Sequence, residues 1–326
     1  MYYLDNSGTD PYWNLALEEF LLKNSKAEYF MLWQNRPSII IGRNQNTLSE
    51  INEDYVKEHS IPVVRRLTGG GAVFHDLGNL NYTFLVNDSG GVGFDFKKHT
   101  APIVEVLRGL SVNAELSGRN DLTIDGKKFS GNSQYRYKGR LLHHGTLLFS
   151  AVLSDVSAAL KVDPSKFEGK GVKSIRSRVT NISEHLTQKL SLPEFKSLIS
   201  DHIKKSSRDF QIYHLKEQEI AATERLAKEK YSTLGWNYGV SPDCNFSKRK
   251  KFSAGSVEVY MTVKDGVIRS LRIFGDFFGE CEIGDIESAL ENVNYREEEI
   301  RQRLAAFDLS RYFSGIDLED LLGVLF

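Results

Sequence analysis

The sequence predicts an α+β fold in which a mixed β-sheet is flanked by helices, followed by a second, small α+β domain. Three observations indicate this architecture. Strand-forming runs concentrate between residues 29 and 149, with helical patterns on both sides. These runs do not alternate regularly with helices, as a doubly wound parallel sheet would require. The length of 326 residues is enough for about two domains.

The composition is that of a folded protein with balanced charge. The chain has 42 basic and 43 acidic side chains, and 40% of its residues are hydrophobic. A net charge near zero disfavours nucleic-acid binding, since phosphate neutralisation requires clustered positive charge. No apolar run approaches the roughly 20 residues that cross a bilayer, and the first residues lack the basic and apolar segments of a secretory leader. We therefore expect a cytoplasmic protein that has neither nucleic acid nor a membrane as its partner.

The first third of the chain combines one helix with short strands. Residues 11–23 are expected to form a helix, which Asp10 caps and Pro11 opens. The tripeptide Asn35-Arg36-Pro37 favours a hairpin-like connection between the first two strands, and a glycine turn separates the third from the fourth. The expected strands lie at residues 29–33, 38–41, 63–64, 72–74 and 80–86.

Two β-hairpins dominate the middle of the chain. Residues 101–110 have a helical spacing of apolar side chains, and a run of strands follows. The dipeptide Asp125-Gly126 predicts a tight turn between two strands, at residues 121–124 and 127–129. A second hairpin is expected around Gly139, and its returning strand continues to Phe149.

The last part of the chain predicts a second domain. A polar stretch at residues 239–243 precedes the basic run at 248–251, and we place the boundary there, which gives domains 1–245 and 246–326. The first domain has 31 basic and 28 acidic residues, and the second has 11 and 15. A hairpin is expected around Asp265-Gly266. Four helices are expected in the second half of the chain. Two precede the boundary, at residues 192–205 and 215–230, and two follow it, at residues 285–290 and 297–306.

The most informative segment is Arg65-Arg66-Leu67-Thr68-Gly69-Gly70-Gly71-Ala72-Val73-Phe74-His75. Three successive glycines allow positive φ angles and let backbone N–H groups approach phosphate oxygens, while an adjacent arginine adds an always-charged contact. The alternative is a glycine-rich hairpin turn with solvated arginines. The segment is not a P-loop, because no Gly-Lys-Ser/Thr follows, and not a dinucleotide-binding fingerprint, because a strand comes next.

Lys127 and Lys128 directly follow a predicted turn. A lysine held on a strand near a bound phosphate and a carboxylate would stabilise negative charge without acting as a nucleophile. Because side chains alternate along a strand, the two lysines should face opposite sides. The alternative is a pair of solvated lysines that flank a turn.

Asp121 and His144 are further candidates. Asp121 could supply an oxygen ligand for Mg²⁺, which usually takes one or two carboxylates together with substrate phosphates; a helix or turn cap is the alternative. His144 adjoins His143, but no other histidine lies at metal-ligand spacing. We therefore expect His144 in the wall of a pocket, and no zinc site.

The polar segment from Lys170 to Asn181 is rich in basic residues and glycine. It is either a solvated run of charge or a loop that orders over an anionic ligand, and its residues do not distinguish the two. The candidate ligand-binding residues in it are Lys170, Gly171, Arg176 and Arg178.

Several ordered motifs together closely resemble the lipoate–protein ligase A family, in the long form with a C-terminal accessory domain. The resemblance covers the whole chain, with residues from about 247 onward matching the accessory domain. Thr68 departs mildly from the family pattern, in which serine is commoner, and so does Ser133, where alanine is frequent. The motifs are Asn14–Glu19, Ile41–Asn46, Arg65–Asn79, Lys128–Asn132, His143–Leu147 and Arg176–Asn181.

The resemblance implies a catalytic domain shared with biotin ligases and a two-step reaction. Lipoate and ATP, with Mg²⁺, would give lipoyl-adenylate and pyrophosphate. The lipoyl group would then pass to a lysine of an apo lipoyl domain, in 2-oxoacid dehydrogenase complexes or in the glycine-cleavage H protein. Carried over by motif, the nucleotide-binding residues would be Arg66, Gly71, Ala72, Val73, Phe74 and Lys128. Lys128 would also contact the lipoyl carboxyl group, Asn79 and His144 would line the same pocket, and residues 170–181 would be the adenylate-binding loop.

The residues disfavour three other functions. A lipoyl or octanoyl amidotransferase needs a cysteine thioester near the acyl site, but Cys244 and Cys281 fall at or beyond the predicted boundary. A biotin ligase is disfavoured because its Gly-Arg-Gly-Arg-x-Gly segment is missing. A non-catalytic lipoyl-domain binding protein would not need the intact Lys128 and glycines.

Overall fold

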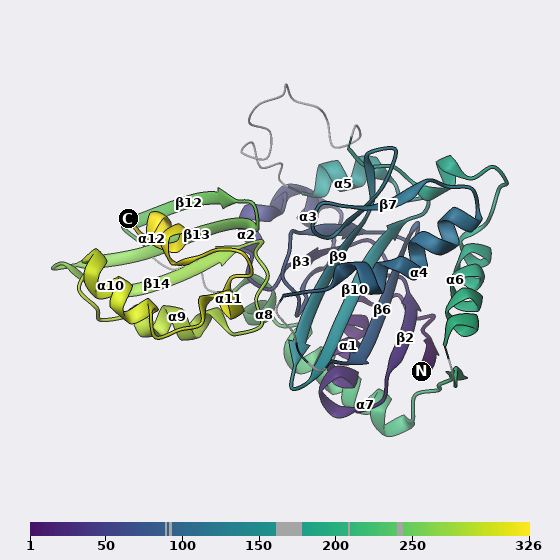
Figure 1. Cartoon of the computed structure of the whole chain (residues 1–326), viewed down its shortest axis with the longest axis horizontal. Helices are drawn as coiled ribbons and strands as arrows, with labels where there is room; N and C mark the ends of the chain where they lie inside the picture. The colour runs from purple at the N-terminus through teal and green to yellow at the C-terminus, as the bar shows by residue number, and fades with distance from the viewer. Residues whose placement is uncertain (89, 91–92, 161–177, 208, 240–243) are drawn as a thin grey trace.

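The structure is a computed structural model, and it describes residues 1–88, 90, 93–160, 178–207, 209–239 and 244–326. Figure 1 shows two bodies side by side. The larger contains a broad sheet and the helices around it, and the smaller contains the last three strands and the helices that follow them.

The larger body is built on an eight-stranded sheet with the order β11-β1-β2-β6-β10-β9-β8-β7. β1 is parallel to both of its neighbours and the other pairs are antiparallel, so the sheet is mixed, as predicted. The strands are β1 (Tyr2–Asp5), β2 (Tyr29–Trp33), β6 (Asn79–Asn87), β7 (Ala114–Ser117), β8 (Asp121–Ile124), β9 (Lys127–Tyr137), β10 (Arg140–Leu148) and β11 (Gln211–Ile212). The predicted hairpins around Asp125-Gly126 and Gly139 are confirmed as β8–β9 and β9–β10.

A second, three-stranded sheet contains β3 (Ser38–Ile41) between β4 (Val63–Arg65) and β5 (Val73–His75). The hairpin expected between residues 29–33 and 38–41 is therefore wrong, because the two strands belong to different sheets. Both are buried along their whole length, so each needs partners on both edges and cover on both faces. β4 and β5 do not pair across the glycine turn either, because β3 lies between them.

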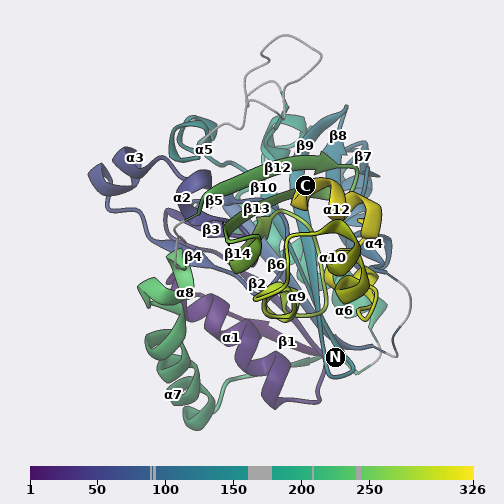
Figure 2. The ribbon, with the colours of Figure 1, turned by 90° about the vertical axis from the view of Figure 1, so that its left-hand side faces the viewer.

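Helices cover both faces of the large sheet. On one face, Phe30, Tyr82 and Phe84 form a core cluster with the apolar sides of α4 (Phe96–Gly109) and α6 (Leu192–Ser206). On the other, α1 (Pro11–Asn24) packs against the alternate strand residues, and Figure 2 shows α7 (Glu217–Leu226) beside it. Asp10 caps α1, as predicted. The remaining segments are α2 (Thr47–Glu50), α3 (Glu53–Glu58), α5 (Leu153–Ala159), the 3-10 helix η3 (Ile182–His185), the π-helical turn η4 (Ala227–Tyr231) and α8 (Leu234–Tyr238).

The smaller body has its own core, whose buried residues run from Ala254 to Leu325. Its sheet has the order β12-β13-β14, and the hairpin predicted around Asp265-Gly266 is confirmed. The basic run at residues 248–251, which we expected beside the boundary, lies within the edge strand β12, where it pairs with β13. The elements are β12 (Phe246–Phe252), β13 (Gly255–Lys264), β14 (Val267–Gly275), α9 (Ile283–Leu290), α10 (Glu297–Leu304), α11 (Leu309–Tyr312) and α12 (Leu318–Leu325). In the described residues of the whole chain, every helix is too short or too polar to span a bilayer.

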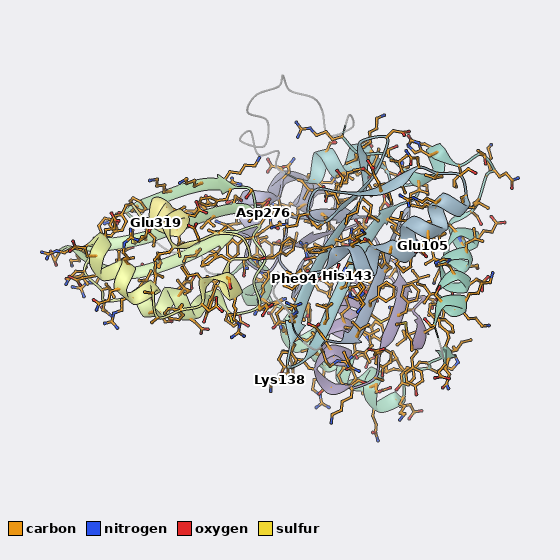
Figure 3. The ribbon with its side chains drawn as sticks, in the orientation of Figure 1. Phe94, Glu105, Lys138, His143, Asp276 and Glu319 are labelled. Atoms are coloured by element: carbon orange, nitrogen blue, oxygen red, sulfur yellow. The ribbon has the colours of Figure 1, made fainter. Side chains whose placement is uncertain are left out.

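Phe278 is the centre of the contact between the two bodies. Its ring packs against the rings of Phe94 and Phe96, with centroids 6.2 and 5.7 Å away, and the guanidinium of Arg119 lies 4.2 Å from its centroid. Figure 3 shows Phe94 at this junction, next to the large sheet. Arg136 adds an ion pair to Glu280, with 2.6 Å between Nη1 and Oε1.

Three buried histidines lead to a prediction about stability. Burial lowers the pKa of His75 to about 3 and that of His99 to about 4, and it holds the pKa of His143 well below 6.5. The unfolded chain therefore binds more protons than the folded chain below about pH 6.5, and the free energy of unfolding should fall as pH drops from about 6.5 toward 4. Each histidine should contribute up to about 1.4 kcal/mol per pH unit. Urea unfolding at several pH values measures the slope, which His99→Gln should flatten and the exposed His214→Gln should leave unchanged.

Candidate active site

A cavity lies between the α1 side of the large sheet and the smaller three-stranded sheet. The large sheet contributes Trp33 from β2, Asn81 from β6, His144 and Thr146 from β10, and Lys128 with Gly131 from β9. The opposite wall is formed by Ile40 on β3, by Arg66, by residues 70–73 and by His75 on β5, and Leu15 of α1 closes one side. Apolar and cationic side chains thus share one buried space.

Six of the predicted site residues meet in this cavity, namely Arg66, Gly71, Ala72, Val73, Lys128 and His144. Phe74 does not line it. Along β5, alternation directs Val73 and His75 toward the cavity and Phe74 into a core with Ile39 and Ile41. The expected contact of Phe74 with a ligand is therefore corrected to a packing role.

Asn79, which was expected to line the pocket, does not line the cavity either. It is fully buried outside the cavity lining, and its Nδ2 donates to Oδ1 of Asn81 at 2.9 Å. Asn81 lies two residues further along the same face of β6 and lines the cavity instead. Asn81, Trp33 and His75 were not predicted as cavity residues, although strand alternation from Asn79 would have indicated the first of them.

Each glycine of the turn has its own structural reason. Gly70 has a φ of +90°, which favours glycine. A Cβ on Gly69 would lie 2.4 Å from the carbonyl oxygen of Phe277, so the absence of a side chain lets the smaller body approach the turn. A Cβ on Gly71 would meet open space, and this residue lines the cavity. The turn is therefore shaped by both bodies of the protein.

Arg66 is buried beneath this turn and holds it through its guanidinium. Its Nη2 donates to the carbonyl oxygens of Gly69 and Gly71 at 2.7 and 2.8 Å, and its Nη1 donates to that of Ile40 at 3.1 Å. Burial lowers the pKa of Arg66 to about 10. Within the described residues the guanidinium has no carboxylate in direct contact, so an anionic ligand in the cavity would complement its charge.

A buried network connects Arg66 to a carboxylate beneath the cavity. Nε of Arg66 donates to Oγ1 of Thr68 at 3.0 Å, and this oxygen lies 2.8 Å from Nε2 of His144. Nδ1 of His144 lies 3.0 Å from the carboxylate of Glu18, which also accepts a 2.6 Å hydrogen bond from Thr83. Since a carboxylate only accepts, His144 carries a proton on Nδ1. Glu18 thus balances the charge of Arg66 through two intervening side chains.

Lys128 lies at the opposite end of the cavity from Trp33. Its Nζ is 2.8 Å from Oδ1 of Asp121, and both side chains are about two-fifths exposed, at 40% and 39%. Its backbone N–H donates to the carbonyl of Arg178 at 2.7 Å, and its carbonyl accepts from the N–H of Thr180 at 2.9 Å. Lys127 is exposed and lies outside the cavity lining. Of the candidate loop residues, Lys170, Gly171 and Arg176 lie outside the described residues, whereas Arg178 is joined to Lys128.

Gly131 sets the space available to the Lys128 side chain. A Cβ at this position would lie 3.1 Å from Nζ and 3.2 Å from Cε of Lys128, so the ammonium would have to move. We expect Gly131→Ala to slow, roughly tenfold, the ATP-dependent activation that the family resemblance implies, since small misplacements of a charged group weaken transition-state contacts. The measurement is the rate of pyrophosphate release. Gly284→Ala, whose Cβ would meet open space, is the control; an unchanged rate in Gly131→Ala would contradict the expectation.

Clustered metal ligands and a thiol at the cavity are the groups that a zinc site and a thioester mechanism would need. In the part of the chain that the structure describes, no group of three or more His, Cys, Asp or Glu residues could hold a metal ion. Both cysteines are described: Cys244 is exposed, Cys281 is half-buried, and neither lines the cavity. Burial also raises the pKa of the Cys281 thiol, which disfavours the nucleophilic thiolate.

The chain matches two family models and full-length relatives. The lipoyl protein ligase A/B catalytic domain matches residues 10–204, and the bacterial lipoate protein ligase C-terminus matches residues 241–325. Lipoate–protein ligase 1 of Staphylococcus aureus is 45% identical over 323 residues and 98% of each chain. The Bacillus subtilis lipoate-protein ligase LplJ is 45% identical over 331 residues and 100% of each chain.

Solved structures show the same fold. The P. falciparum protein LipL1, solved in complex with lipoate, superposes with a TM-score of 0.79 at 27% identity over 94% of each chain. A lipoate-protein ligase A bound with ATP has a TM-score of 0.62 at 25% identity and covers 74% of this chain and 99% of its own. The fold and cavity thus define an α+β ligase. The chain belongs to the lipoate–protein ligase A family, in the form that carries the C-terminal domain, and it is an enzyme.

Proposed function

We propose that this ligase activates lipoate with ATP and then transfers the lipoyl group to a lysine of an apo lipoyl domain. The observation that carries the proposal is the single cavity that joins apolar side chains, Leu15, Trp33 and Ile40, to two cationic ones, Arg66 and Lys128. An acid with an apolar chain and a charged head group has a matching arrangement of apolar and charged parts. Relatives solved with lipoate and with ATP support this pair of substrates.

In the first step, a lipoate carboxylate oxygen attacks the α-phosphorus of ATP. The bond from this phosphorus to the oxygen bridging to the β-phosphate breaks, and pyrophosphate leaves with lipoyl-AMP remaining. Lys128 would contact both the carboxylate and the α-phosphate, and it would stabilise the charge that develops between them. The amides of Gly71, Ala72 and Val73 would face the nucleotide, and Arg66 would hold them in place.

In the second step, the acceptor lysine attacks the acyl carbonyl of lipoyl-AMP with its neutral amine. An amide bond forms, the bond from the carbonyl carbon to the phosphate oxygen breaks, and AMP leaves while the amine releases a proton. We propose as acceptors the acyltransferase subunits of 2-oxoacid dehydrogenase complexes and the glycine-cleavage H protein. A bi-partite lipoate protein ligase from Thermoplasma acidophilum, 30% identical with a TM-score of 0.67, is described with its E2 lipoyl domain as one lipoylation system, which supports this class of partner.

Asp121 fits a role in binding Mg²⁺. One or two carboxylates and the substrate phosphates are the usual protein environment of this ion, and Asp121 is a partly exposed carboxylate beside Lys128 at the head of the cavity. Bound there, Mg²⁺ would neutralise charge on the ATP phosphates. Residues 170–181 would form the adenylate-binding loop, attached to Lys128 through Arg178 and Thr180.

We further propose that residues 1–245 form the catalytic domain and residues 246–326 the accessory domain, and that the enzyme acts in the cytoplasm. The separate core of the C-terminal residues supports this division.

The decisive experiment measures pyrophosphate release from ATP with and without lipoate, followed by mass spectrometry of apo acceptor proteins. Lipoate-dependent release and an added lipoyl mass on one lysine are expected. Exchange of acyl groups between lipoyl domains without pyrophosphate release would instead indicate an amidotransferase. Binding of a lipoyl domain without either reaction would indicate a non-catalytic binding protein.

A further inference from the structure

A buried histidine in the cavity wall has a hydrogen-bonding group without a partner. His75 is 3% exposed and lines the cavity, and its Nε2 has no hydrogen-bond partner among the described residues. Leaving a buried polar group unpaired is costly, so such a group in a ligand cavity indicates a contact that the ligand supplies.

The hydrogen bonds of the neighbouring Asn14 and Asn35 amides indicate that Nε2 of His75 is a donor. Nδ2 of Asn14 donates to the carbonyl oxygens of Gly8 and Gln34 at 3.1 and 2.9 Å, so the orientation of the Asn14 amide is set. The same Nδ2 lies 2.9 Å from the Asn35 amide, and Asn35 must face it with Oδ1, because two amide N–H donors would repel each other. The Asn35 amide must therefore direct its Nδ2 to Nδ1 of His75, 3.0 Å away, and Nδ1 accepts.

The His75 ring is neutral, and its single proton is on Nε2. Burial is the main cause that lowers the pKa of His75 to about 3, and the charge of Arg66 adds to it. Because Nδ1 accepts from Asn35, the proton occupies the other ring nitrogen. The cavity wall thus presents an N–H donor at neutral pH.

Strand register places this donor far from Lys128. Trp33 pairs with Asn81, Asn81 pairs with Thr146, and the N–H of Gly131 donates to Oγ1 of Thr146 at 3.2 Å. These residues cross the sheet from β2 through β6 and β10 to β9, which lie side by side in Figure 1. The crossing spans about three strand spacings, roughly 14 Å. The His75 ring lies beside that of Trp33, with centroids 6.3 Å apart, and the Lys128 side chain lies beside Gly131.

We propose that His75 is a specificity-determining residue, which donates its Nε2–H to a ring sulfur at the far end of the lipoyl chain. The inference rests on the proposed function, in which the carboxylate binds at Lys128. A dithiolane sulfur has lone pairs that accept a hydrogen bond weakly, as a thioether does. Octanoate has the same carbon chain without an acceptor at that end, and it would bury the donor unpaired. His75 therefore favours lipoate over octanoate.

Two substitutions of His75 test the role of the Nε2–H donor separately from that of the rest of the ring. His75→Asn can keep an acceptor for Asn35 near the position of Nδ1, but it removes the group that reaches the cavity. His75→Gln is the matched control, because its longer amide can place an N–H near the position of Nε2. The readout is the ratio of kcat/KM for lipoate to that for octanoate, measured as pyrophosphate release.

We expect His75→Asn to lower this ratio roughly five- to tenfold, and His75→Gln to retain most of it. A merely structural role would lower both kcat/KM values together and leave the ratio unchanged. An unchanged ratio in His75→Asn would overturn the proposal.

A ligand series tests the same contact without relying on a variant that folds. In the unmodified enzyme, 6-(methylthio)hexanoate, which has the same chain length as octanoate and places one sulfur on the sixth carbon, should bind several-fold more tightly than octanoate by calorimetry. Equal binding of the two acids would count against His75 as a donor. This measurement needs no ATP, so it remains informative if lipoate-dependent pyrophosphate release, and with it the proposed function, fails.

Discussion

Replacement of Lys128 by alanine is expected to abolish lipoate-dependent pyrophosphate release, whereas Lys127→Ala should retain most of it. The physical reason is position on the strand. Lys128 lines the cavity with its ammonium 2.8 Å from Asp121, while Lys127 is exposed outside the cavity lining. Removal of a charge that acts in a transition state costs roughly 10²- to 10³-fold or more in rate.

The comparison between the two lysines is sharp because they are neighbours on one strand and carry the same charge. A general effect of positive charge would lower both rates equally, and that result would refute the assignment. Circular dichroism and urea unfolding of both variants verify that they fold. Lys128→Arg adds a test of geometry, since a planar guanidinium keeps the charge but does not reproduce a point contact, and we expect it to remain strongly impaired.

Replacement of Glu18 by glutamine is expected to lower both activity and stability, although Glu18 lies below the cavity. Its carboxylate accepts from Thr83 and His144 and balances the charge of Arg66 through Thr68. A glutamine has only one acceptor oxygen, so one buried donor loses its partner, which costs about 1–3 kcal/mol of unfolding free energy. We expect a loss of roughly tenfold or more in kcat/KM for ATP, because Arg66 and the glycine turn lose their support.

The network can be tested as a unit. Glu18→Gln, His144→Gln and the double variant form a cycle in which urea unfolding and kcat/KM are measured. Because the two side chains act through each other, the double variant should lose less than the sum of the single losses. Glu224→Gln, an exposed carboxylate on α7, is the control. Additive effects, or activity within twofold of the unmodified enzyme in Glu18→Gln, would contradict the network.

Local pattern was sufficient for much of the fold. The Asp10 cap and Pro11 predicted the start of α1, and the turn dipeptides Asp125-Gly126 and Asp265-Gly266 predicted two hairpins that the structure confirms. Each of these features depends on residues close in sequence, whose conformational preferences act wherever the segment lies. The motif resemblance to the family, which the family models and relatives confirm, likewise rests on contiguous residues.

Local sequence patterns did not predict which strands pair when the strands lie far apart in the chain. The runs at residues 29–33 and 38–41 look like the arms of a hairpin, but their neighbours are β1 and β6 in one case and β4 and β5 in the other. Both runs are apolar throughout, so periodicity alone does not assign a face or a partner. The basic run in β12 was not predicted to be a strand for a related reason: charged residues are tolerated on an exposed edge strand, and composition alone resembles a linker.

By itself, the sequence indicated the strands of the central hairpins, the start of α1 and the opposite orientation of Lys127 and Lys128, and its motifs named the glycine turn and the cations of the candidate site. Only the tertiary structure decided which face of each strand meets the cavity. Alternation along β5 predicts that Phe74 faces away from Val73 and His75. Only the packing of β5 against β3 determines that Phe74 faces the core and His75 faces the cavity. The roles of Glu18, Asn81 and His75 depend on hydrogen bonds between residues brought together by folding. Local sequence patterns do not predict such hydrogen bonds.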